Sequence, residues 1–101
     1  MGKFMIRGWY PPNKYKELLK VYMSKDKPPY PDFLKKTLNV TTVNADGNWQ
    51  TYALYEFPDD KTKEATNALL KRYALYTTVE GYRFVVENVM DAEEGIKLLM
   101  G

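Results

Sequence analysis

Residues 39–57 read NVTTVNADGNWQTYALYEF, and this stretch decides the fold because it contains two strands and the turn between them. Asn39–Ala45 is rich in β-branched residues, which favour strands. Asp46-Gly47 is a typical two-residue hairpin turn, and Asn48–Phe57 is a second run rich in aromatic residues. The stretch therefore predicts an antiparallel hairpin.

A strand and a helix precede this hairpin. Lys3–Tyr10 reads KFMIRGWY, an apolar run closed by Pro11-Pro12, and is predicted to be a strand. A helix over residues 13–24 follows, because proline is tolerated in the first helical turn. Its apolar residues recur at the spacing of one helical face: Tyr15, Leu18, Leu19 and Tyr22. Three prolines within residues 25–31 then prevent the helix from continuing.

A helix and a strand also follow the hairpin. Pro58-Asp59-Asp60 starts a helix over residues 61–76, and Tyr82–Met90 after Gly81 is predicted to be a fourth strand. Asp91 and Glu94 form a capping-box pattern that begins a short last helix. The residues that we expect to face inward are Ala65, Ala68, Leu69, Tyr73 and Tyr76 on the longer helix and Ile96, Leu99 and Met100 on the last one.

The resulting order is β-α-β-β-α-β, which is that of the ferredoxin-like α+β fold. We therefore expect one domain over residues 1–101, with an antiparallel sheet of order 4-1-3-2. Two helices cover one face of the sheet, and a short C-terminal helix follows the last strand. The other face of the sheet is predicted to stay open.

The composition excludes several kinds of site. The chain has no His and no Cys, which excludes disulfides, metal sites built from these residues and acid–base chemistry by His, and we expect no metal and no cofactor. The net charge of +2 and the lack of an RNA-recognition signature argue against nucleic acid as a partner. Without an export signal or an apolar run of about 20 residues, we expect a cytoplasmic protein with no membrane partner. Nine tyrosines suit a core that opens onto a cavity or an interface.

Alternation along the strands assigns residues to the two faces of the sheet. The core face is predicted to hold Phe4, Ile6, Ala53, Phe84 and Val86. The open face then holds Met5, Arg7, Trp9, Tyr52, Leu54, Glu56, Arg83, Val85, Glu87 and Val89. This face has too much apolar area to remain in water, so we expect a second copy to cover it, sheet against sheet, in a two-fold homodimer.

The chain resembles the dimeric α/β-barrel superfamily, in particular its small members with a domain of unknown function. The resemblance lies in Lys3-Phe4-Met5, Asp46-Gly47 and Met90-Asp91-Ala92-Glu93-Glu94. Relatives in this superfamily include cofactor-free monooxygenases, haem-degrading enzymes, lactone isomerases, dehydratases and binding proteins, so the resemblance implies a dimeric barrel but no single activity. The haem-degrading branch uses a cavity His and an Asn on the first strand, where this chain has Arg7 and Gly8.

The charged and aromatic residues of the open face are the candidate site. The predicted ligand-binding residues are Arg7, Trp9, Tyr52, Arg83 and Glu87, and Trp49 and Tyr55 are further candidates for an aromatic wall. Arginines bind small anions through bidentate hydrogen bonds, and Glu87 or Glu56 in a poorly hydrated cavity is a candidate base. The alternative is an ion-pair network that fixes the register of the dimer.

Three functions follow from this reading. The first is binding of a small organic molecule, aromatic or anionic, in a cavity where the two sheets meet. The second is a cofactor-independent enzyme, a monooxygenase or an isomerase, with Glu87 or Glu56 as base and Arg7 stabilising charge. The third is a structural dimer that binds no ligand.

Overall fold

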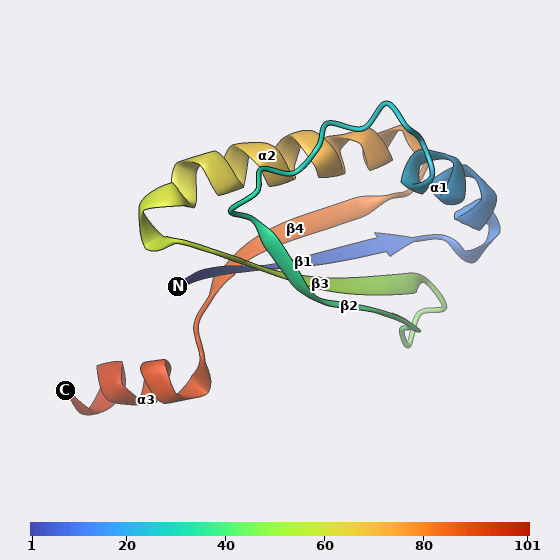
Figure 1. The fold of residues 1–101 in the computed structure, drawn as a ribbon. Helices are drawn as coiled ribbons and strands as arrows, with labels where there is room; N and C mark the ends of the chain where they lie inside the picture. The colour runs from blue at the N-terminus through green and yellow to red at the C-terminus, as the bar shows by residue number, and fades with distance from the viewer.

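The computed structural model describes residues 1–101, which form a four-stranded antiparallel sheet and three helices (Figure 1). The strand order is β2-β3-β1-β4, which confirms the predicted α+β fold of ferredoxin-like βαββαβ order. The strands are β1 (Gly2–Tyr10), β2 (Lys35–Val43), β3 (Trp49–Phe57) and β4 (Arg83–Val89). The helices are α1 (Tyr15–Tyr22), α2 (Thr62–Ala74) and α3 (Ala92–Met100), and short 3-10 turns cover Pro12–Lys14, Asp59–Lys61 and Leu75–Thr78.

β1 is a central strand and is paired along its length on both sides. Arg7, for example, lies opposite Tyr52 of β3 and Val85 of β4. Residues that are paired across neighbouring strands point to the same face of the sheet, so this register fixes which side chains meet. Gly8 allows a close approach on the helix-covered face, because a Cβ atom there would lie 2.7 Å from the Tyr82 hydroxyl oxygen.

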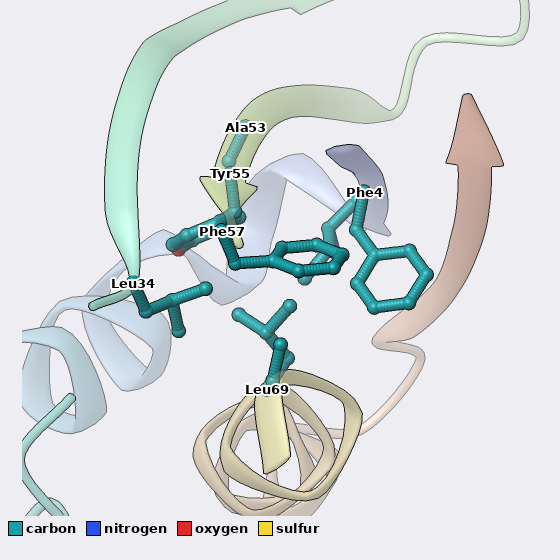
Figure 2. Packing of buried hydrophobic residues seen from close by; sticks show 8 residues of the cluster. Phe4, Leu34, Ala53, Tyr55, Phe57 and Leu69 are labelled. Carbon is teal, nitrogen blue, oxygen red and sulfur yellow. The ribbon is translucent and has the colours of Figure 1, made fainter. Parts of the chain in front are cut away.

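The hydrophobic core lies between α2 and the sheet (Figure 2). Leu69 points from α2 towards the aromatic rings of Phe4 and Phe57, whose centroids are 4.9 Å apart. The buried cluster confirms the predicted core positions on β1 and β3, while the two predicted on β4 are partly buried and pack against it. Its members are Phe4, Ile6, Leu34, Ala53, Tyr55, Phe57, Ala65 and Leu69.

The hairpin differs from the prediction in length and in its turn. β2 begins at Lys35, four residues before the predicted start, and Val43 is paired with Trp49. The Asn44 amide donates to the Asn48 carbonyl at 2.9 Å, which leaves a three-residue loop in place of the predicted two-residue turn. Gly47 has a φ of 87°, but no other residue of this loop has a positive φ. A two-residue turn of the Asp-Gly kind needs positive φ at both positions, whereas a three-residue loop needs it only at the glycine.

Helix α1 is less buried than predicted. No residue of α1 is buried, and Tyr15, Leu19 and Tyr22 are each about half exposed, because this helix of eight residues extends past the end of the sheet (Figure 1).

The longest helix has 13 residues, and none of the helices has the length and apolar composition needed to cross a membrane.

The prediction that α3 packs inward is wrong. Ile96, Leu99 and Met100 are 54%, 90% and 84% exposed, because the chain leaves the sheet after β4 and no element of the same chain lies opposite the helix (Figure 1). The capping box is also absent. The Asp91 carboxylate accepts a hydrogen bond from Lys3 and caps no amide of the helix.

We predict that Leu69→Ala lowers the free energy of unfolding by about 2–5 kcal/mol, because it leaves a cavity in a fully buried position. The matched control is Leu70→Ala on the same helix, where the side chain is 44% exposed and the loss should stay below about 1 kcal/mol. Urea unfolding of the two variants measures both values. Equal losses would contradict the position of α2 on the sheet.

Candidate functional site

The open face has the composition that alternation predicts. Across the sheet, one row of paired residues is Leu38, Leu54, Met5 and Glu87, and the next is Val40, Tyr52, Arg7 and Val85. None of these side chains is covered by a helix, and Leu38, Val40 and Val85 are among the exposed large hydrophobic residues of the chain. These two rows are therefore apolar apart from Arg7 and Glu87.

Four of the predicted site residues meet on this face. The Arg7 guanidinium donates two hydrogen bonds to the Glu87 carboxylate, at 2.9 Å from Nε and 3.3 Å from Nη2. The guanidinium carbons of Arg7 and Arg83 each lie 5.3 Å from the centroid of the Trp9 ring. Both distances allow a cation–π contact. Tyr52, the fifth predicted residue, is paired with Arg7 on the neighbouring strand.

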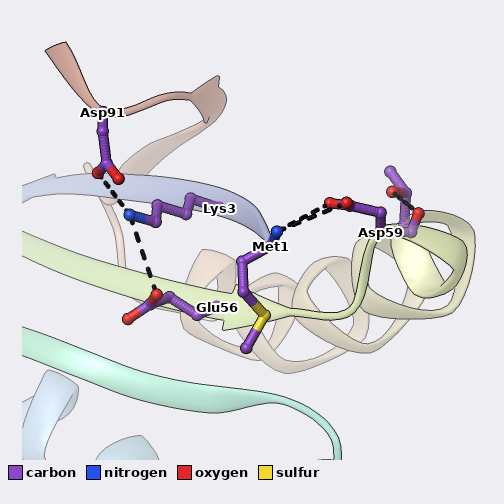
Figure 3. Close-up of polar contacts among 6 residues, drawn as sticks. Met1, Lys3, Glu56, Asp59 and Asp91 are labelled. Atoms are coloured by element: carbon purple, nitrogen blue, oxygen red, sulfur yellow. Dashed lines mark hydrogen bonds and ion pairs between the residues drawn. The ribbon is translucent and has the colours of Figure 1, made fainter. Parts of the chain in front are cut away.

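Glu56 does not join this cluster. It lies at the other end of the open face, where the Lys3 ammonium is 3.9 Å from its carboxylate and also bonds Asp91 (Figure 3). The hydrogen bond from Lys3 holds the pKa of Asp91 below its usual value. Lys3 thus connects β1, β3 and the segment that leads into α3, and Glu56 belongs to that group of ion pairs.

Trp49 and Tyr55 do not belong to an aromatic wall with Trp9. Both lie on the helix-covered face, where Trp49 stacks on Tyr10 with ring centroids 6.5 Å apart. Tyr55 is fully buried in the core. Its position follows from the register, because odd-numbered residues of β3 point towards α2 and even-numbered ones point away.

One cavity of the chain lies on the helix-covered side of the sheet. It has a volume of about 100 Å³ and is formed by α1, α2, the loop between α1 and β2, and the sheet. Three cationic side chains line it, and no carboxylate does. We call it the tyrosine pocket, because six of its lining residues are Tyr10, Tyr22, Tyr30, Tyr73, Tyr76 and Tyr82; the others are Leu18, Lys27, Lys36, Asn39, Thr51 and Arg72.

The cations of the tyrosine pocket are held against aromatic rings. Arg72 donates two hydrogen bonds to the Pro28 carbonyl, at 2.8 and 3.1 Å, and its guanidinium carbon lies 4.2 Å from the centroid of Tyr30. The Lys36 ammonium lies 5.6 Å from the centroid of Tyr55 and 6.0 Å from that of Tyr30. Burial lowers the pKa of Lys36, and the positive charges of Arg72 and Lys27 lower it further.

Tyrosine hydroxyls form the polar interior beside these cations. The Tyr55 hydroxyl is 2.8 Å from the hydroxyls of both Tyr30 and Tyr73, so three rings are connected by two hydrogen bonds. Burial raises the pKa of Tyr73 and Tyr82, and it raises that of Tyr76 to about 12. These phenols are therefore neutral near pH 7 and add no negative charge to the cavity.

A β-bulge directs Lys36 into the tyrosine pocket. Lys36 is paired with Tyr55 and Leu38 with Leu54, so Thr37 is an extra residue in β2. Without the bulge, Lys36 and Leu38 would point to the same face of the sheet, because alternate residues of a strand do so. With it, Lys36 faces the pocket and Leu38 faces the open side.

One feature of the sequence pointed to this pocket, namely the number of tyrosines. Its lining residues come from three strands, two helices and two loops, so no local motif contains them. No protein-family model and no curated protein matches the chain. Membership of the dimeric α/β-barrel superfamily therefore stays a prediction.

We predict that the protein loses stability as the pH rises from 10 to about 12. A tyrosine with a raised pKa keeps its proton in the folded state at a pH where the unfolded chain has lost it, so folding is favoured below pH 10 and this contribution is lost above it. Tyr76→Phe should reduce the loss, whereas Tyr15→Phe, on an exposed residue, should not. Urea unfolding at several pH values measures the effect, and identical pH profiles for wild type and Tyr76→Phe would contradict it.

Proposed function

We propose that this protein binds a small organic anion in the tyrosine pocket. The observation that carries the proposal is the set of three cations, Lys27, Lys36 and Arg72, around one cavity with no carboxylate among its lining residues. Like charges that line one cavity favour an oppositely charged partner, and no carboxylate of the chain lines this one. A small organic anion is also among the ligands expected from the sequence. The tyrosine pocket, however, lies on the helix-covered face of the sheet, whereas the predicted site lies on the open face.

The size and lining of the pocket narrow the range of possible ligands further. A cavity of about 100 Å³ is smaller than one of about 150 Å³ that holds a benzene molecule, so a compact carboxylate suits it better than a large ring system. Arg72 donates from Nε and Nη2 to the Pro28 carbonyl, which leaves the N–H groups at the end of its guanidinium, on Nη1 and Nη2, to bind a carboxylate. The neutral tyrosine hydroxyls add donors without adding negative charge. We therefore favour small carboxylates over neutral or cationic molecules.

We predict that acetate and pyruvate bind to the protein and that their uncharged analogue acetamide binds at least ten times more weakly. Arg72→Gln should weaken binding of the two anions by about 10- to 100-fold, which corresponds to one charged hydrogen bond. Chemical-shift titration by NMR measures the dissociation constants and maps the residues affected.

The matched control for this prediction is Lys71→Gln, because Lys71 precedes Arg72 on α2, is exposed and does not line the pocket. It removes the same charge from the protein, so it should leave the dissociation constants unchanged. Equal effects of the two substitutions, or equal binding of acetate and acetamide, would overturn the proposal.

We also propose that two copies associate through their open sheet faces. The apolar rows around Met5, Leu54 and Val85 lie uncovered in a single chain, and contiguous apolar patches of this kind mark interaction sites. The face carries both signs of charge, in Arg83 and Glu87, so it is able to complement itself about a two-fold axis. The predicted ligand-binding residues Arg7, Trp9, Tyr52, Arg83 and Glu87 would then face the partner sheet.

We propose that α3 takes part in this association, because its apolar residues Ile96, Leu99 and Met100 are exposed in a single chain. We assign no chemical role to Glu87 and Glu56, because each has a cationic partner in the same chain.

We predict that Trp9→Lys yields a monomer, or protein that precipitates, because it removes a large apolar side chain from this face and places a third positive charge beside Arg7 and Arg83. The control is Asn13→Lys, which makes the same change in net charge at an exposed position away from the sheet. Sedimentation velocity reports the molecular mass of each variant. A dimer that persists in Trp9→Lys, or a monomeric wild type, would exclude association through this face.

A further inference from the structure

Lys36 lines the tyrosine pocket together with two other cations, Lys27 and Arg72, and no carboxylate lines it. We infer that Lys36 is a nucleophilic lysine that forms an imine with a small oxo acid held in this pocket. The inference rests on the proposed function, because it requires that the pocket bind a carboxylate.

The surroundings of Lys36 differ from those of the ion-paired lysines. Lys3, Lys14 and Lys61 each lie within 4.0 Å of a carboxylate, which stabilises the charged ammonium. Lys36 has no such partner. The groups that face it are Arg72 and Tyr73 from α2, Lys27 and Tyr30 from the loop after α1, and Tyr55 from β3.

This environment is that of an activated amine. Only the uncharged form of a lysine is a nucleophile, and both burial and nearby cations favour that form. Both influences act on Lys36, whose pKa is lowered by burial and by Arg72 and Lys27. Lys36 is exposed on an edge strand, so a small reagent is able to reach it.

The arrangement of the cations selects an oxo acid among carbonyl compounds. In a 2-oxo acid the reactive carbonyl is bonded directly to the carboxylate, so a carboxylate held by Arg72 and Lys27 places that carbonyl beside Lys36. An aldehyde without an acidic group lacks this anchor. A molecule such as pyruvate also has the size that a cavity of about 100 Å³ accommodates.

The reaction needs no oxidant, reductant or metal. The lone pair of the Lys36 nitrogen forms a bond with the carbonyl carbon, and the carbonyl electron pair moves to oxygen, which takes up a proton. The nitrogen of the resulting carbinolamine still carries two protons. One of them leaves with the hydroxyl as water, the other passes to solvent, and the neutral imine remains. The two hydrogen bonds among the hydroxyls of Tyr30, Tyr55 and Tyr73 use two of their three protons, which leaves one O–H to donate a hydrogen bond to the oxygen as charge develops on it.

The test is to incubate the full chain with pyruvate and sodium cyanoborohydride, which reduces an imine to a stable secondary amine. Peptide mass spectrometry then locates the adduct and gives its rate of formation at each lysine. We expect Lys36 to be modified at least ten times faster than the exposed Lys16 and Lys63, with a rate that saturates with pyruvate concentration. Added acetate, which competes for the pocket but forms no imine, should slow modification of Lys36 alone.

Two variants separate this inference from the proposed function. Lys36→Arg keeps the charge and should abolish the fast modification, while Lys35→Arg, on the adjacent residue of the open face, should leave it unchanged. If pyruvate binds to Lys36→Arg but Lys36 of the wild type is modified no faster than Lys16, the imine is excluded and the anion site stands. If pyruvate does not bind to the wild type or to the variant, both proposals fail.

Discussion

The hydroxyl group of Tyr55 is buried in the middle of the molecule, and a buried hydroxyl destabilises the fold unless it is hydrogen-bonded. Its two partners come from different parts of the chain, Tyr30 from the loop after α1 and Tyr73 from α2. Satisfying this one group therefore brings the loop and the helix together over β3. Arg72 strengthens the same connection, because it bonds the Pro28 carbonyl and covers the ring of Tyr30.

The tyrosine pocket follows from that constraint. Once the loop lies across α2, Lys27 and Lys36 line one cavity together with Arg72, and no carboxylate lines that cavity. Like charges in proximity destabilise a protein that has no ligand. Such an arrangement is retained more readily where a bound anion relieves it, and the same charges that attract a carboxylate also make Lys36 a better nucleophile.

The sequence predicted the elements and the faces better than the contacts. Period-two alternation in β1 and β3 located Ile6 and Ala53 in the core, and the order of elements gave the arrangement of the strands, because both depend on local pattern. The position of Lys36 depends on an extra residue, Thr37, and nothing in the local sequence marks such a bulge. The apolar face of α3 is visible in the sequence, but whether another element covers that face depends on the rest of the fold. The prediction that Leu99 points inward was therefore wrong. The pocket was missed for the same reason, since distant segments form it.

The bulge in β2 also affects how the edge of the sheet behaves. β2 is an outer strand, and all nine of its residues are exposed. A flat, uncharged outer strand is a template on which further strands can add and grow into fibres. Here the strand begins with two lysines and then departs from regular pairing at Thr37, both of which hinder such addition. The irregularity that directs a lysine into a pocket thus also protects a small, tyrosine-rich protein from aggregation.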